Sequence, residues 1–434
     1  LIVRPPGQSG KAKRGQLCFD AAFECGNLGR ADHITDLEYD LFVRPDTCRP
    51  RARFWFNFTI ENVRLDQRVI LNIVNLGKET TLFDGDMTPL VRSTSRPKWQ
   101  RIPRRLIFYH RSLAHRGRKI LSIAFAFDRE EDVYQFSAAA SYSYSRLQKH
   151  LAAWEKKAQA FATRQSIAQT TQKRRIDLDT KEDIKRVVLI IARTHGGEPP
   201  SSFVIPMLNP DGVFLGNQRS DLLGGDLNRS WNRATSYAHP ALVAVNDLLK
   251  KLASEKVTII TIFYLNFSVR QLFVMIPVTY LSSYYFTLFE RQAVLPKFLG
   301  ARIEAWRPEA CFFNADSVLA GTARRALPTG AVDAYTVLVS LGGRRLAPRG
   351  PYIHYTEDAY SKIGRSLAKS LCDYYRHIGV IPPRVGRSKK KERGRRRRRR
   401  PVIERDRSEI RFTYLPTLRS ILGNRILGTY RILG

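Results

Sequence analysis

The sequence predicts an all-β domain followed by an α/β domain. Short segments rich in aromatic and β-branched residues, separated by turn signals, fill residues 17–145. Continuous apolar runs of strand length alternate with helical patterns in residues 178–380. Because continuous apolar runs are typical of central strands buried on both faces, the second region is expected to hold a sheet covered by helices.

Three segments carry the β prediction for the first domain. Residues 53–60 mix aromatic with β-branched side chains, residues 69–75 are rich in β-branched ones, and residues 120–127 alternate at period two. Turn signals such as Asp84-Gly85 separate them. Residues 145–172 are rich in Ala, Gln and Lys with apolar positions at helical spacing, so they predict a helical linker over residues 146–177.

The α/β prediction rests on three strands and two helices. Residues 186–193, 257–265 and 334–340 are apolar runs that predict buried strands. Residues 238–253 predict an amphipathic helix, and Thr356 is a suitable cap for a second helix that ends near Arg376.

The formal net charge of the chain is +34. Residues 1–16 are predicted to be a disordered basic leader and residues 381–434 a disordered basic tail, because blocks such as Arg395–Arg400 repel themselves. The remaining body is also basic and favours acidic protein tails or nucleic acid as partners. For the arginine block itself, a nuclear-localisation segment or a solvated tail is favoured over nucleic-acid binding. No apolar stretch reaches the roughly 20 residues that span a bilayer, so no membrane partner is expected.

One short segment carries metal-binding chemistry. His195 and Glu198 lie three positions apart, just after a predicted central strand, where sites on parallel sheets usually form. A catalytic zinc ion needs three protein ligands and one open position. Alone, the pattern is more typical of a glycine turn with an incidental His and Glu, so the downstream residues decide its interpretation.

The downstream segments supply groups that bind a carboxylate. Residues 206–213 are predicted as a short strand followed by an Asn-Pro-Asp-Gly turn, and Arg219 adds a cation. Asn228 and Arg229 then place an amide beside a guanidinium, which binds a carboxylate at two points. A structural salt bridge would explain any single arginine here, but the ordered series predicts a substrate-carboxylate site.

These motifs resemble the cytosolic carboxypeptidases of the M14 zinc metallocarboxypeptidase family, over residues 22–375. Phe-Glu-Cys-Gly-Asn-Leu at 23–28 and Trp-Phe-Asn-Phe-Thr-Ile-Glu-Asn at 55–62 resemble its amino-terminal β-domain, and Tyr-Thr-Glu-Asp-Ala-Tyr at 355–360 resembles its last helix. The resemblance implies a β-sandwich-like domain packed on an α/β carboxypeptidase domain with a mixed sheet.

The resemblance also implies a function. It implies one Zn²⁺ ion held by His195 and Glu198, and removal of glutamates from polyglutamate chains or carboxyl termini of tubulin and other acidic proteins. Arg219, Asn228 and Arg229 look like the groups that hold the substrate carboxylate, and Arg324 is expected to help select an acidic side chain. The cytosol and the cytoskeleton are the implied locations, and the basic tail adds the nucleus as an alternative.

The sequence departs from the family pattern at the two remaining catalytic positions. The family's third ligand is a His, whereas residues 265–270 read Leu-Asn-Phe-Ser-Val-Arg without a His, and Ser268 is expected to take the ligand's place. The family's general base is a Glu in a Tyr-Thr-Leu-Glu-Val-Ser motif, whereas residues 335–340 place Leu338 there. A serine hydroxyl is a poor zinc ligand and a leucine cannot accept a proton, so no catalytic residue is intact by this comparison.

Two further departures concern packing. Residues 139–144 differ from the family's Cys-Tyr-Pro-Tyr-Thr-Tyr motif at the domain junction, and Val204 continues directly into Ile205 where the family has a helix and most of a strand.

Three interpretations of the function stay open after these departures: an active deglutamylating enzyme, a catalytically dead pseudoenzyme that binds acidic tails, and an incomplete gene model of an active enzyme.

Overall fold

The structure is a computed structural model that describes most of the chain. It covers residues 2–3, 14–77, 83, 86–158, 163–180, 186–203, 207–255, 258–268, 273–277, 293–304, 306, 311–314, 321–327, 333–345, 350–383 and 411–413. The turn predicted at residues 84–85, the direct connection at 204–206 and most of the basic tail lie outside these ranges.

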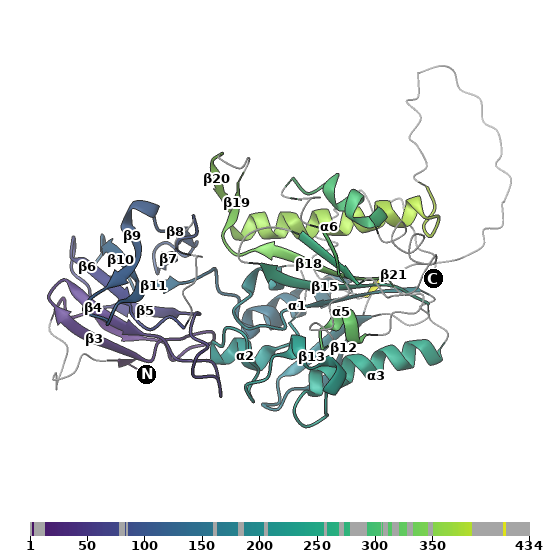
Figure 1. The fold of residues 1–434 in the computed structure, drawn as a ribbon, viewed down its shortest axis with the longest axis horizontal. Coiled ribbons are helices and arrows are strands. Elements are labelled where there is room, and N and C mark those ends of the chain that lie inside the picture. Colours follow the sequence, from purple (N-terminus) through teal and green to yellow (C-terminus); the bar gives the residue numbers. More distant parts are fainter. Residues whose placement is uncertain are drawn as a thin grey trace, which may run out of the picture.

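The amino-terminal domain consists of two sheets packed face to face (Figure 1). One has the strand order β1-β2-β5-β11-β7-β8 and the other β3-β4-β6-β10-β9. Neighbouring strands are antiparallel except β4 and β6, which run parallel. The strands are β1 (Ile2–Val3), β2 (Cys18–Asp20), β3 (Arg30–Thr35), β4 (Glu38–Phe42), β5 (Asn57–Glu61), β6 (Arg68–Ile73), β7 (Leu90–Ser93), β8 (Gln100–Arg101), β9 (Ile107–Ser112), β10 (Arg118–Ala126) and β11 (Tyr134–Ser137).

Aromatic side chains fill the space between these two sheets. Phe58 on β5 stacks on Phe136 of the neighbouring strand with ring centroids 5.7 Å apart, and Phe125 of the other sheet meets Phe136 edge-on at 5.1 Å. Such pairs contribute about 0.5–1.5 kcal/mol beyond the burial of their area. The aromatic segments that predicted the β-domain are therefore its core.

The predicted helical linker is helical only in its first half. Helix α1 (Tyr144–Ala158) buries Leu147, Leu151 and Trp154 at the predicted spacing. Beyond it, the helix prediction to residue 172 is wrong, because β12 (Thr163–Gln169) and β13 (Arg175–Thr180) pair as an antiparallel hairpin. Pairing of β12 with β13 across the hairpin outweighs the helix propensity of this segment.

The second domain is built on a mixed sheet, as predicted. Its strand order is β17-β16-β18-β15-β14-β21, and only the β16–β18 pair is antiparallel. Helix α6 lies on one side of the sheet and α3 on the other (Figure 1). The strands are β14 (Arg186–Ala192), β15 (Thr258–Ser268), β16 (Phe273–Pro277), β17 (Phe312–Asn314), β18 (Asp333–Ser340) and β21 (Arg411–Thr413), with a separate hairpin of β19 (Gly343–Arg345) and β20 (Tyr352–His354).

Two helices of this domain, α2 and α6, begin at residues whose side chains cap them. The helices are α2 (Pro210–Leu215), α3 (Pro240–Ser254), α5 (Ala323–Ala326) and α6 (Glu357–His377), and short 3₁₀ turns lie at Arg104–Leu106, Pro199–Phe203, Leu227–Arg229 and Trp231–Arg233. Residues 293–300 are also helical. Thr356 caps α6, since its side chain accepts a hydrogen bond from the Ala359 N–H, as its sequence position predicts. No helix among the described residues is long and apolar enough to cross a bilayer.

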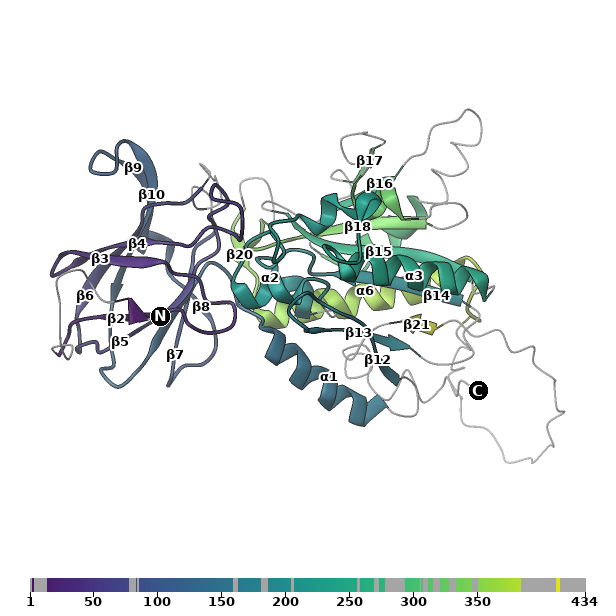
Figure 2. The ribbon, with the colours of Figure 1, turned by 90° about the horizontal axis from the view of Figure 1, so that it is seen from below.

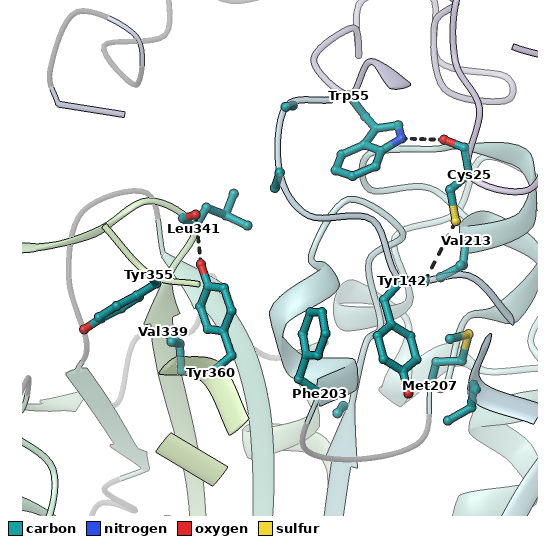
Figure 3. Close-up of a cluster of buried hydrophobic side chains, with 14 of the residues drawn as sticks. Cys25, Trp55, Tyr142, Phe203, Met207, Val213, Val339, Leu341, Tyr355 and Tyr360 are labelled. Carbon is teal, nitrogen blue, oxygen red and sulfur yellow. Dashed lines mark hydrogen bonds between the residues drawn. The ribbon is translucent and has the colours of Figure 1, made fainter. Parts of the chain in front are cut away.

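The two domains share one continuous core (Figure 3). Trp55 of the β-domain donates its indole N–H to the Cys25 carbonyl, and the Cys25 thiol lies 3.9 Å from the Tyr142 carbonyl. The Tyr142 ring meets Phe203 edge-on, and Phe203 stacks on Tyr360 of α6. The segment of residues 139–144, which departs from the family motif, therefore still supplies a buried aromatic side chain to the junction.

Candidate active site

The turn that follows β14 carries the two predicted metal ligands. β14 ends at Ala192, and Arg193 then adopts a positive φ of 52° that starts a sharp turn. A Cβ at Gly196 would lie only 2.3 Å from the Asn217 carbonyl oxygen, so only glycine allows this close approach. The turn buries both His195 and Glu198, so neither is an incidental surface residue.

His195 lies between two carboxylates. Its Nδ1 is 2.7 Å from Glu198 Oε1, and its Nε2 is 2.9 Å from Asp226 Oδ1. Burial alone would lower the pKa of His195, but the charges and hydrogen bonds of Glu198 and Asp226 outweigh it and raise the pKa to about 9. Burial opposes ionisation of Asp226, yet His195 and Arg219 together hold the pKa of its carboxyl well below its usual range.

Asp226 also joins the two predicted carboxylate-binding segments. Its Oδ2 accepts a hydrogen bond from Arg219 Nε at 2.6 Å, and its Oδ1 accepts one from the Asn228 N–H at 2.9 Å, which caps the short turn Leu227–Arg229. One carboxylate thus fixes His195, Arg219 and Asn228 relative to each other. The structure therefore brings these three predicted site residues together.

Arg229 and Asn228 present donors at the same place. The Arg229 Nη1 donates to the Asn228 carbonyl at 2.8 Å, and no described carboxylate pairs with its guanidinium. The Asn228 Oδ1 accepts from the Ala323 N–H, while its side-chain NH₂ has no partner among the described residues. A half-buried arginine without an acidic partner, beside an amide donor, is an arrangement suited to an anion.

The positions predicted for the third ligand and the base lie near the carboxyl ends of two paired strands of the sheet. Ser268 ends β15, which pairs in parallel with β14, and Ser268 pairs with Ser340 at the end of β18. Leu338 lies two residues before that end and is only 8% exposed. Arg324 lies in α5, next to Ala323, but the side chains of Ser268 and Arg324 are outside the described part of the structure.

The donors present fit two of the three positions of a zinc site. Asp226 contacts Nε2 of His195, and Nδ1 of the same ring faces Glu198. A carboxylate at one ring nitrogen commonly orients the other nitrogen of a histidine toward a metal ion. Glu198 Oε2 is buried without a hydrogen-bond partner, so this oxygen is available to a cation. Within the described residues, however, no group of three His, Cys, Asp or Glu side chains is arranged to hold a metal ion.

Three residues that support the site were not predicted from the sequence. Asp226 and Arg193 are close to the predicted ligands, but nothing in their spacing indicates a contact with His195 or Gly196. Arg193 is fully buried and donates from Nη2 and Nε to the Gly196 carbonyl, at 2.6 and 3.1 Å, and from Nη1 to Ser202. It therefore holds the ligand turn in shape.

The third unpredicted residue comes from the other domain. Asp46 is 2% exposed, and its carboxylate accepts three backbone N–H bonds, from Gln218, Arg219 and Ser220, at 2.7, 2.7 and 2.9 Å. These bonds fix the loop that carries Arg219. Only the tertiary structure reveals this role, since 173 positions separate Asp46 from Arg219.

We expect Asp46→Ala to lower the free energy of unfolding by about 3 kcal/mol. The substitution leaves one buried and two partly buried N–H groups without their acceptor. Hydrogen bonds to a charged group contribute about 1.5–3 kcal/mol each, though not additively. Urea denaturation of the full chain measures the effect. Asp36→Ala is the control, because that side chain is fully exposed; equal losses in the two variants would contradict the role assigned to Asp46.

Comparison with solved structures identifies the class of the fold. The chain is similar to a metallo-carboxypeptidase from Burkholderia cenocepacia, with a TM-score of 0.69 and 17% identity over 83% of this chain and 99% of that one. It is similar to a metallo-carboxypeptidase from Pseudomonas aeruginosa, with a TM-score of 0.64 and 18% identity over 82% and 99% of the two chains. At these identities the likeness concerns the fold, which is that of a metallocarboxypeptidase.

Sequence relatives identify the family. Residues 19–131 match the cytosolic carboxypeptidase N-terminal domain. The chain is 41% identical to mouse cytosolic carboxypeptidase 6 over 90% of this chain and 80% of that protein, and 40% identical to the human protein of the same name over 88% and 83%. The chain belongs to the cytosolic carboxypeptidase family. The resemblance drawn from its motifs is thereby confirmed, and the family is one of peptide-bond hydrolases.

Proposed function

We propose that this chain acts on the glutamate-rich carboxyl-terminal ends of acidic proteins, tubulin among them, and removes glutamate from them in the cytosol. The observation that carries the proposal is the pair of donors on Asn228 and Arg229, which lie beside the buried His195–Asp226 contact and have no carboxylate partner among the described residues. A substrate carboxylate would supply that partner.

The basic character of the chain supports the choice of an acidic substrate. The net charge of +34 attracts polyanions over several ångströms and accelerates their encounter with the site. Arg219 remains 43% exposed at its side chain while its Nε donates to Asp226, so its guanidinium is partly accessible to solvent beside that carboxylate. Arg324 is proposed to add a second cation that selects a glutamate side chain.

One zinc ion is the proposed cofactor, and His195 and Glu198 are the residues that would hold it. Zinc, when bound, polarises a scissile carbonyl and acidifies a water molecule. The chain's own residues perform the remaining tasks. Asp226 orients the His195 ring, Arg193 holds the turn between the two ligands, and Asn228 and Arg229 position the terminal carboxylate of the substrate.

A second candidate function is the binding of acidic tails without cleavage. Leu338, at the position of the general base, is buried and apolar, and the described residues supply no third zinc ligand. Loss of a general base alone slows such a reaction by about 10²–10⁴-fold. In this candidate function the donors bind the substrate carboxylate, but the peptide bond is not hydrolysed.

One experiment separates the two candidates. The purified full chain is assayed for bound zinc by elemental analysis and for glutamate release from a polyglutamylated peptide. The enzyme proposal requires both zinc and release. Tight binding of the peptide with neither zinc nor release would leave only the binding function, and failure to bind a peptide with a free carboxyl terminus would overturn both.

A further inference from the structure

A long segment of the amino-terminal domain contains no acidic residue. Residues 87–127 include ten Lys and Arg and no Asp or Glu. This segment includes the β9–β10 hairpin, which projects from the amino-terminal domain (Figure 2). Charge of one sign over such a length destabilises the fold through self-repulsion. This cost suggests that the charge has a role in binding.

Some cations of this segment already have structural partners. Arg96 pairs with Asp128, Arg92 donates to Gln135, and Arg101 reaches across the domain junction to the Leu341 carbonyl. These three side chains are explained by the fold. They are therefore excluded from the argument.

Within the described part of the chain, four other arginines of this segment are exposed and form no ion pair. Arg104 and Arg105 precede β9, Arg116 lies in the turn after it, and Arg118 begins β10. Among the described residues none of the four contacts a carboxylate, and Arg104 donates only to the nearby Ile107 carbonyl. Cations are thus available at both ends of one strand.

The strand between these arginines is at the edge of its sheet. β9 pairs with β10 on one side, and no described strand pairs with its other side. Its six residues extend for about 20 Å at 3.3 Å per residue. Phe108 on this strand is 52% exposed. An exposed strand edge offers backbone N–H and C=O groups to an added strand.

We propose that the basic edge, defined as β9 with Arg104, Arg105, Arg116 and Arg118, binds an extended acidic polypeptide segment as an added strand. The acidic segment pairs its backbone with β9 and its carboxylates with the arginines at both ends. The identity of the partner rests on the proposed function, in which acidic proteins are the substrates. The basic edge would then bind a segment of the substrate protein that is distant from the carboxyl terminus of that protein.

A polypeptide fits this surface better than a nucleic acid. Phosphates can pair with the arginines, but they cannot use the alternating donors and acceptors of a strand edge. A simpler explanation is that the arginines only prevent edge-to-edge aggregation, as charged residues often do on edge strands. That explanation predicts no contact between acidic peptides and β9.

The test uses the full chain and a Glu-rich peptide blocked by acetylation and amidation. The peptide has no free carboxylate, so its binding does not depend on Asn228 and Arg229. Reversing the four charges of the basic edge (Arg→Glu at 104, 105, 116 and 118) is expected to weaken binding by about tenfold or more. The matched control reverses four exposed cations elsewhere (Lys149, Lys156, Arg233 and Lys250), and should change the affinity by less than about twofold.

A second measurement locates the contact. Hydrogen exchange is measured on the unmodified chain with and without the blocked peptide. The peptide should slow exchange of the backbone amides of residues 107–112, whereas a peptide with proline at every second position should leave their exchange rates unchanged. Equal losses in both charge variants, or no protection of β9, would overturn the proposal. So would a DNA oligonucleotide that protects β9 where the peptide does not. Glutamate release from a free-ended peptide is measured separately, so a failure here leaves the proposed function standing.

Discussion

Replacing Ser268 with His is expected to raise the zinc affinity of the chain by about 100-fold or more, and adding Leu338→Glu is expected to raise glutamate release by about 10²–10⁴-fold. The reason is the register of the sheet. β14, β15 and β18 are neighbouring parallel strands, so the His195 turn, Ser268 and Leu338 lie near the carboxyl ends of these strands. Groups that orient a metal ligand from outside change affinity by 10–100-fold, and a direct ligand contributes more.

Zinc stoichiometry and glutamate release together measure this result. Ser268→His with Leu338→Gln is the matched control, since Gln has the shape of Glu but cannot take a proton from water. If the control releases glutamate as fast as the Glu variant, Leu338 does not occupy the position of the base. If the unmodified chain already binds one zinc ion tightly, its third ligand comes from another residue.

Arg229→Ala is expected to weaken binding of a peptide with a free carboxyl terminus by about ten- to a hundredfold. The Arg229 guanidinium has no described acidic partner, so the substrate carboxylate is its proposed one, and hydrogen bonds to charged groups contribute about 1.5–3 kcal/mol. Fluorescence anisotropy with a labelled Glu-rich peptide measures the loss.

Two comparisons make the Arg229 result specific. Arg233→Ala removes an exposed arginine from the neighbouring turn and should leave the affinity nearly unchanged. Amidation of the peptide should abolish the difference between Arg229→Ala and the unmodified chain. A loss that persists with the amidated peptide would show that Arg229 acts through the fold or through net charge, and would exclude it from the carboxylate site.

The sequence predicted the fold because its signals are local. The apolar runs that became β14 and β18, and the cap at Thr356, are each readable within one segment. The helix expected to residue 172 ends at Ala158 because strand pairing between β12 and β13 depends on a partner that spacing does not reveal. The Asn-Pro-Asp-Gly segment likewise forms the start of α2, with Asn209 as its cap, where a turn was expected.

The candidate site was predictable in part for the same reason. His195 and Glu198 are three positions apart, and Asn228 and Arg229 are adjacent, so their types and order suggested a role. Asp226 bonds to a histidine 31 positions away, and Asp46 bonds to a loop of the other domain. Contacts at these separations follow from the packing of whole domains, and no single segment encodes them.

The shared core at the domain junction bears on solubility. Phe203 and Tyr360 stack beneath Tyr142, so removal of the residues before 146 would uncover aromatic surface that the β-domain and its connection now cover (Figure 3). Large exposed apolar patches promote association of chains. The β-domain therefore covers aromatic surface of the second domain, and a substitution that loosens the β-domain is expected to promote precipitation of the protein.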